Sequence, residues 1–88
     1  MADYSMTFAR SARKELEKLP PSLARRIFRR IEALMKVPRP SGAIRLQGNS
    51  NLWRIRVGDY RVIYSIDDPA RMIDISAVRN RRDAYRDL

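Results

Sequence analysis

The sequence predicts one α+β domain, over residues 1–88, in which a helical hairpin packs on one face of a mainly antiparallel β-sheet. Length is the first reason, because 88 residues are too few to build two hydrophobic cores. Organisation is the second: apolar residues recur at helical spacing before Gly42, and short runs rich in β-branched and aromatic residues then follow up to Val78. The hydrophobic fraction of 44% is typical of a chain that folds.

The first part of the chain predicts a strand followed by two helices. Residues 4–8, YSMTF, alternate weakly and favour a short strand. Apolar residues at helical spacing predict a helix within residues 9–19, which the Pro-Pro pair at 20–21 ends. We expect Ser22 to cap the second helix. That helix has arginines on its polar side and one apolar stripe, which consists of Leu23, Ile27, Ile31, Leu34 and Met35.

The second part of the chain predicts the strands of an antiparallel meander. Its four apolar runs are residues 43–46, 52–57, 60–66 and 72–78. The turn-rich segments GNSN, GD and DDPA separate them. The expected order is therefore β-α-α-β-β-β, with the short run at 43–46 as an additional strand. The polar last ten residues, RNRRDAYRDL, predict a short C-terminal helix or a loose tail.

The two-residue loop Gly58-Asp59 allows the pairing of two runs to be predicted. With glycine first, this loop favours a type II′ turn, and the pairing that follows sets Arg56 opposite Arg61. Alternate pairs lie on alternate faces of a hairpin, so one face is apolar. We expect that face to point into the core, and its residues are Trp53, Ile55, Val57, Tyr60, Val62 and Tyr64.

The other face of the predicted hairpin carries Arg54, Arg56 and Arg61. Like charges placed directly opposite one another destabilise a hairpin by a few tenths of a kcal/mol to about 1 kcal/mol. Two interpretations stay open: an ordinary polar face whose long side chains splay in water, or guanidinium groups that converge on a phosphate backbone. Because the aromatic residues point inward, a surface that stacks nucleic-acid bases is disfavoured.

The charge of the chain points to a polyanionic partner. Lysine and arginine together number 19 against 10 acidic residues, which gives a formal net charge of +9. Sixteen of these basic residues are arginine, whose planar fork suits phosphate. A bias toward arginine codons would also explain the excess, so the placement of the arginines has to decide between the two explanations.

Several functional classes are disfavoured by what the sequence lacks. With no cysteine and no histidine, it has no thiolate metal site and lacks the commonest general base. We expect no metal and no cofactor. No segment approaches the roughly 20 apolar residues of a membrane span, and residues 1–10 do not look like a signal peptide. We therefore expect a cytoplasmic protein with no membrane partner.

A second basic cluster lies at the C-terminus, and its residues are Arg79, Arg81, Arg82, Tyr85 and Arg86. If this segment is helical, Arg81 and Tyr85 are four residues apart and share a face. A solvated basic end with one anchoring ring is the plain alternative. Residues 72–78 would deliver this cluster to one end of the sheet, where the arginines of the hairpin could be near.

These motifs resemble a known family. The pattern L-x-G followed by LWRIRVGDYRVIYSID, and then MIDISAVRNRRDAY, is similar to the RelE side of the RelE/ParE toxin superfamily of toxin–antitoxin pairs. The resemblance implies a ribosome-dependent endoribonuclease that cleaves mRNA in the A site, where the 2′-hydroxyl of the RNA attacks the adjacent phosphodiester. It also implies three partners: the ribosome, its mRNA, and a cognate antitoxin that wraps the toxin and inhibits it.

The resemblance also assigns roles to residues. Arg61 matches the arginine that stabilises the transition-state phosphate, Arg81 the general acid or leaving-group stabiliser, and Tyr85 the general base. Arg54 and Arg56 stand where well-known relatives have lysines near the scissile bond, and Asn80 stands where many have histidine. The expected catalytic residues are thus Arg61, Arg81 and Tyr85, and the expected RNA-binding residues are Arg45, Arg54, Arg56, Arg79 and Arg82.

Two other functions stay open at the level of sequence. One is inhibition of DNA gyrase in the manner of ParE, which needs no catalytic tail. The other is a basic module that binds nucleic acid without reacting. Toxicity that survives loss of Arg81 and Tyr85 would favour the first, and binding without reaction products would favour the second.

Overall fold

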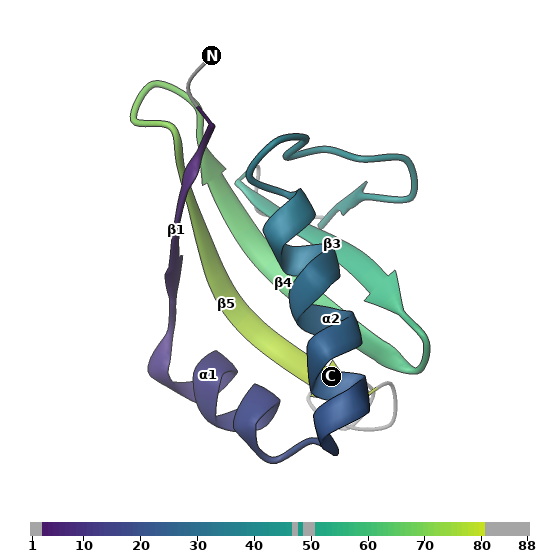
Figure 1. The fold of residues 1–88 in the computed structure, drawn as a ribbon. Coiled ribbons are helices and arrows are strands. Elements are labelled where there is room, and N and C mark those ends of the chain that lie inside the picture. Colours follow the sequence, from purple (N-terminus) through teal and green to yellow (C-terminus); the bar gives the residue numbers. More distant parts are fainter. Residues whose placement is uncertain (1–2, 47, 49–50, 81–88) are drawn as a thin grey trace.

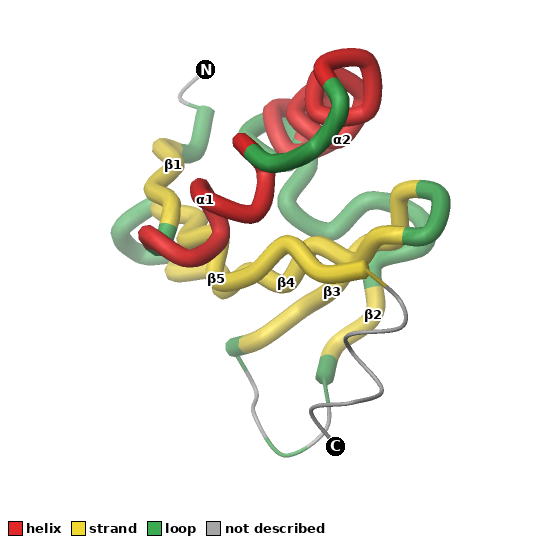
Figure 2. Tube along the Cα trace, turned by 90° about the horizontal axis from the view of Figure 1, so that it is seen from below, coloured by secondary structure: helices red, strands yellow, loops and turns green. Residues whose placement is uncertain are grey.

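Two helices cover one face of a five-stranded sheet in the computed structural model, which describes residues 3–46, 48 and 51–80. Figure 2 shows both helices on the same side of the sheet. In chain order the elements are β1 (Ser5–Phe8), α1 (Arg10–Glu17), α2 (Pro21–Ala33), β2 (Ile44–Arg45), β3 (Leu52–Val57), β4 (Tyr60–Asp67) and β5 (Met72–Asn80) (Figure 1). The predicted α+β class and the order of helices and strands are confirmed.

The strand order in the sheet is β1-β5-β4-β3-β2. The strands from β2 to β5 form the predicted antiparallel meander. β1 pairs with β5 in parallel, so that Ser5 lies opposite Met72 and Phe8 opposite Ile75. Sequence reasoning did not foresee this pairing of the first strand with the last, because neither strand carries a local signal for its distant partner. The intervening helices supply the connection that parallel strands require.

The β3–β4 hairpin has the predicted register. Arg56 lies opposite Arg61, and Trp53 lies opposite Tyr64. Gly58 has a φ of 59°, whereas Asp59 is not among the described residues with positive φ. Positive φ at the first loop residue alone is the mark of a type II′ turn, which glycine adopts without steric cost. This local geometry fixes which residues of both strands share a face.

The core lies between the helices and one face of the sheet. α2 contributes Ile27 and Ile31, the residue that follows it, Leu34, is also fully buried, and α1 contributes Ala12. The predicted inward face of the hairpin is confirmed, because Ile55, Val57, Val62 and Tyr64 are buried, while Trp53 and Tyr60 pack against the same core. Each large apolar side chain stabilises the fold by about 1.5 to 3 kcal/mol when it is fully buried.

Polar contacts tie the loop after α2 to the sheet. The hydroxyl of Tyr64 donates to the carbonyl oxygen of Pro38 at 2.7 Å. Nη2 of Arg39 lies 2.8 Å from Oδ2 of Asp68, whose other oxygen accepts from the hydroxyl of Tyr4. These bonds hold the pKa of Asp68 below its ordinary value, chiefly through Arg39 and then through Tyr4. Burial raises the pKa of Tyr64 to about 12.

Three element boundaries differ from the sequence prediction. α2 begins at Pro21, and no side chain caps it, so the prediction that Ser22 is its cap was wrong. The reason is that proline is already suited to the first helical position, where its missing N–H is not needed. The run at 43–46 forms only the two-residue β2. β5 extends to Asn80, so Arg79 belongs to the sheet and not to the predicted tail, whose residues 81–88 lie outside the described part of the chain.

Candidate functional site

Three arginines form one row across three neighbouring strands. Arg61 in β4 lies directly opposite Arg56 in β3 on one side and directly opposite Arg79 in β5 on the other. Directly opposed residues share a face of the sheet, so all three side chains lie on the face that the helices leave open. We call Arg56, Arg61 and Arg79 the arginine row.

A β-bulge in β5 places Arg79 in the row. Ile63 pairs with Ala77, but the next residue of β4, Tyr64, pairs with Ile75, so Ser76 is the extra residue of β5. Strict alternation from the buried Ile75 would put Arg79 on the core face. The extra residue shifts the alternation by one, which buries Val78 and turns Arg79 to the open face.

The arginine row concentrates positive charge at one end of the open face. Cβ atoms of directly opposed residues lie about 4.5 to 5.5 Å apart, so the side chains of Arg56 and Arg79 leave the sheet beside that of Arg61. Arg61 is half-buried and its Nε is buried, whereas Arg56 and Arg79 are exposed. A central guanidinium partly shielded from water interacts more strongly with an anion than one in open solvent. The row is therefore suited to bind a phosphodiester group.

The other predicted RNA-binding residues are distributed over both faces. Arg54 shares the open face with the row, because it lies two residues before Arg56 in β3. Arg45 pairs with Trp53, so it lies at the sheet edge on the helix-covered side, away from the row. The predicted residues Arg81, Arg82 and Tyr85 lie outside the described residues.

The end of β5 leads toward those three residues. Asn80 pairs with Tyr60, beside the β3–β4 turn, one residue after Arg79. In the sequence, the predicted catalytic segment thus follows directly after β5, the strand that carries Arg79. Sequence reasoning placed Arg79 in a tail. The three-residue spacing of the apolar Ile75 and Val78 was the signal that could have placed it in the sheet.

Two features are absent from the described residues. Across residues 3–46, 48 and 51–80, no three histidine, cysteine or acidic side chains lie together as a metal-binding group. Within the same ranges, neither helix has the length and apolar character that crossing a bilayer requires. The strongest chemical feature that remains on the open face is the cluster of guanidinium groups.

Comparison with known proteins shows the class of protein that this fold and site define. Residues 6–85 match the family described as ParE toxin of type II toxin-antitoxin system. The chain is 32% identical to the toxin in the archaeal RelE–RelB complex from Pyrococcus horikoshii OT3, with a TM-score of 0.80, and the match covers 90% of this chain and 96% of that one. The chain therefore belongs to the RelE/ParE superfamily of toxins, as its motifs indicated.

Two relatives from one bacterium define the branch more narrowly. Toxin RelG of Mycobacterium tuberculosis is 31% identical over 84 residues, which cover 94% of this chain and 97% of that protein. The RelBE2 toxin–antitoxin complex of the same organism matches with a TM-score of 0.77 at 28% identity, over 90% of this chain and 99% of that one. The chain is thus a RelE-type toxin of a type II toxin–antitoxin system.

Proposed function

We propose that this toxin is a ribosome-dependent endoribonuclease that cleaves mRNA in the A site, in the cytoplasm, and so inhibits translation. The arginine row is the observation that carries the proposal. Phosphoryl transfer depends chiefly on holding the reacting atoms in line and on neutralising charge around phosphorus. Three guanidinium groups opposed across neighbouring strands meet the second need without a metal ion or a cofactor.

The reaction divides among the residues as follows. The 2′-oxygen of the RNA attacks the adjacent phosphorus, the bond from phosphorus to the 5′-oxygen breaks, and a cyclic phosphate forms. Arg61, at the centre of the row, binds the charged phosphate oxygens in the transition state. Tyr85 takes the proton of the 2′-hydroxyl, and Arg81 stabilises or protonates the departing 5′-oxygen. Arg54 and Arg56 position the strand by binding neighbouring phosphates, and Arg79 completes the row.

The role of Tyr85 needs a large change in its acidity. A phenol titrates near pH 10, so a base active at neutral pH needs a pKa lowered by roughly 2 to 3 units. One opposite charge within about 4 to 6 Å lowers a pKa by about 1 to 3 units. Two or three arginines near the ring are therefore sufficient, and Arg81 is four residues away in the sequence.

We further propose that an acidic antitoxin binds this toxin in its host. The solved complex from Pyrococcus horikoshii pairs a related RelE with RelB. A net charge of +9 attracts an acidic chain and accelerates its association. Copurification of the native toxin from its host checks this proposal, and toxin isolated without a bound acidic chain would contradict it.

Primer extension on translating ribosomes tests the cleavage. We expect the wild-type protein to cut mRNA on ribosomes, and Arg61→Ala and Arg81→Ala to abolish cutting with their circular dichroism spectra unchanged. Tyr85→Phe should impair cutting severely. Arg10→Ala, on the exposed side of α1, removes the same charge elsewhere and is the matched control. Wild-type rates in either active-site arginine variant would overturn the assignment.

The ribosome is expected to supply what the arginines do not. The arginine row binds phosphate charge and does not recognise base sequence, so the ribosome must position the substrate. Purified RNA should therefore be cut weakly or not at all, and strong cutting of free RNA would contradict ribosome dependence.

Inhibition of DNA gyrase is the second candidate, because the matching family is named for ParE. It predicts that toxicity survives Arg81→Ala and Tyr85→Phe and that supercoiling by purified gyrase is inhibited. Loss of toxicity in both variants, with gyrase unaffected, would favour mRNA cleavage.

A further inference from the structure

Apolar side chains form a second row on the open face, directly beside the arginine row. Ile63 in β4 lies opposite Arg54 in β3 and opposite Ala77 in β5. Ile44 in β2 lies opposite Arg54 on the other side of β3. Ile63 follows Arg61 by two residues in β4, which sets the two rows about 6.8 Å apart. We call Ile44, Ile63 and Ala77 the aliphatic row.

The aliphatic row does not belong to the hydrophobic core. Ile44 is 49% exposed, and Ile63 and Ala77 are half-buried. None of the three is among the described side chains that form the core or pack against it. Single apolar residues are common on protein surfaces, whereas these three lie in one row beside charged groups. Since the solvated face of an antiparallel sheet usually carries polar residues, the row favours a surface that binds a ligand.

Charge changes sign along the open face. Arg61 lies near the β3–β4 turn, and Ser65 and Asp67 lie further along β4, beyond the aliphatic row. Asp74 lies opposite Ser65, and its carboxylate accepts a hydrogen bond from the hydroxyl of Thr7 at 2.7 Å. A phosphate backbone is attracted to the arginine row and repelled from the acidic end of the face. We therefore expect the backbone to run across the strands, along the arginine row.

This path places a base of the bound strand over the aliphatic row. The sugar of each nucleotide separates its base from its phosphate, so the base lies to one side of the backbone. On one side of the arginine row, β3 and β4 end at the Gly58-Asp59 turn. On the other side lies the aliphatic row. A base directed past the turn would stay in water, whereas a base over the aliphatic row buries apolar surface.

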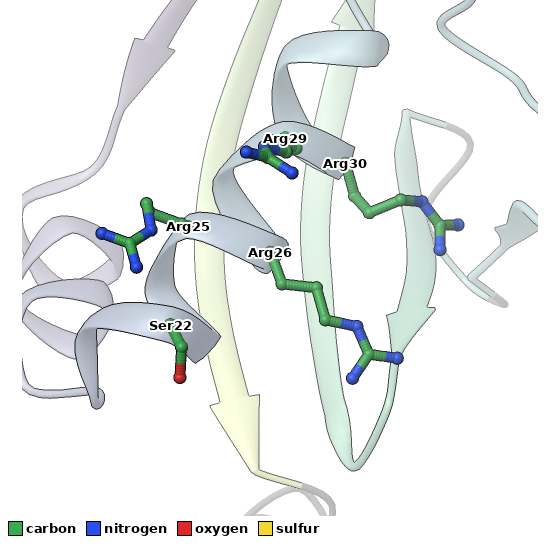
Figure 3. A pocket seen from close by; sticks show the side chains of 5 residues that line it. All are labelled: Ser22, Arg25, Arg26, Arg29 and Arg30. Carbon is green, nitrogen blue, oxygen red and sulfur yellow. The ribbon is translucent and has the colours of Figure 1, made fainter.

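The outer side of α2 is also rich in arginine but has no such apolar neighbours. Figure 3 shows the five side chains that line an open hollow there, all of them charged or hydroxyl-bearing: Ser22, Arg25, Arg26, Arg29 and Arg30. Side chains of this kind can bind phosphate but cannot cover the apolar face of a base. Only the open face of the sheet, among the described surfaces, sets guanidinium groups and an aliphatic row side by side. It is therefore suited to contact both the phosphate and the base of one nucleotide.

The contact with the base differs from aromatic stacking. The aromatic residues of the hairpin, Trp53, Tyr60 and Tyr64, belong to or pack against the core. Ile63 and Ala77 offer aliphatic surface, which attracts the flat face of a base in proportion to the area covered. A purine has two fused rings and covers more of this surface than a pyrimidine. Since aliphatic groups form no hydrogen bonds to base edges, the contact distinguishes purines from pyrimidines but not adenine from guanine.

We propose that the aliphatic row is a base subsite, in which the base beside the bound phosphodiester packs flat on Ile63 and Ala77 and a purine is preferred. This inference rests on the proposed function, since it takes RNA to be the strand that the arginine row binds. Ile63 determines the preference, because it lies in the same strand as Arg61 and at the centre of the aliphatic row. Ile44, at the β2 edge, borders the subsite.

Binding of short RNAs that cannot react tests the base subsite without cleavage. The ligands are 2′-O-methylated trinucleotides with adenine, cytosine or no base at the centre, titrated into the toxin by calorimetry. Adenine should bind about 3- to 10-fold more tightly than cytosine, and the abasic ligand should bind least. Ile63→Thr keeps a β-branched side chain, which suits a strand, and should remove most of this preference. The slope of log K against log[salt] should not change, because the phosphate contacts remain.

Two further variants complete the test. Val37→Thr is the matched control, because it makes a similar exchange at a 54% exposed aliphatic residue in the loop after α2. Ile63→Val is a smaller change that should lower the preference by a smaller factor, and it tests the subsite even if Ile63→Thr does not fold. An equal loss of preference in the control would overturn the proposal, as would an unchanged preference in folded Ile63→Thr.

The remaining outcomes separate this inference from the proposed function. Weaker antitoxin binding by Ile63→Thr, with its preference for adenine intact, would assign the aliphatic row to a protein partner and overturn the proposal. A toxin that prefers adenine through Ile63 but cuts no mRNA on ribosomes would refute the proposed function and support the base subsite. Cleavage on ribosomes by a toxin that binds adenine, cytosine and abasic ligands equally would refute the base subsite and leave the proposed function in place.

Discussion

The substitution Arg56→Gln should make the protein more stable and less active. Arg56 lies directly opposite Arg61, and the pair carries like charges on an exposed face. An opposed pair of like charges costs about 0.2 to 1 kcal/mol, and glutamine removes it while it keeps most of the length of the side chain. Exposure of Arg56 favours a middle value of about 0.5 kcal/mol, because water screens the repulsion.

That free energy corresponds to a measurable change in melting temperature. For a domain of this size, 1 kcal/mol shifts the melting temperature by about 4 to 8 °C, so we expect an increase of roughly 2 to 4 °C in dilute buffer. In 1 M salt the Debye length falls to about 3 Å, and the increase should nearly vanish. Thermal unfolding followed by circular dichroism at both salt concentrations measures the effect, with Arg10→Gln as the control for a change in net charge.

Activity should change in the opposite direction. Loss of one charge-assisted hydrogen bond to phosphate costs about 1.5 to 3 kcal/mol, which lowers the rate of mRNA cleavage at low ribosome concentration by about 10- to 100-fold. A melting temperature that falls or stays constant in dilute buffer would refute the argument that repulsion between Arg56 and Arg61 destabilises the fold. Cleavage at the wild-type rate would refute the argument that Arg56 binds RNA during the reaction.

The polar contacts around the loop after α2 give three smaller predictions. Tyr64→Phe leaves the carbonyl of Pro38 without its hydroxyl donor and should lower the free energy of unfolding in urea by about 1 to 3 kcal/mol. Because the pKa of Tyr64 is raised to about 12 from 10.0, its contribution to the free energy of unfolding should be fully present below pH 10 and be lost between pH 10 and 12. The fall in stability over that range should be smaller in Tyr64→Phe. Because Arg39 and then Tyr4 lower the pKa of Asp68, its contribution should be present above about pH 4 and be lost as acid protonates the folded carboxylate, and Asp68→Asn should remove that loss. Urea unfolding midpoints measured across these two pH ranges check both pH predictions. Midpoints that do not change with pH would contradict the assignments.

Local signals explain how much of the fold could be predicted. The Gly58-Asp59 turn fixed the register of β3 and β4, since a two-residue loop leaves one pairing for the strands it joins. The apolar stripe of α2 likewise identified Ile27, Ile31 and Leu34 as core. The parallel pairing of Ser5–Phe8 with β5 could not be predicted, because it depends on packing between segments more than 60 residues apart.

The candidate site was predictable to the same extent. Arg56 and Arg61 were placed opposite one another because their strands share a tight turn. Arg45 was also predicted to bind RNA, and the register of β2 puts it on the other side of the sheet. Membership of Arg79 in the row depends on a bulge, and alternation counted from the sequence gives the wrong face. Irregularities of this kind are decided by burial in three dimensions.

Burial of apolar residues in β5 is itself what assembles the row. Strict alternation would expose Val78 to water and direct the guanidinium of Arg79 into the core. Among the described residues, that core contains no buried polar or charged residue. Burying an unpaired charge is far more costly than exposing one valine. One extra residue between Ile75 and Ala77 avoids that cost and therefore stabilises the fold. Ser76 suits that position because its side chain is small and only partly buried. Once the bulge forms, Arg79 must lie on the open face opposite Arg61, so the hydrophobic core that stabilises the fold also sets the third charge of the site.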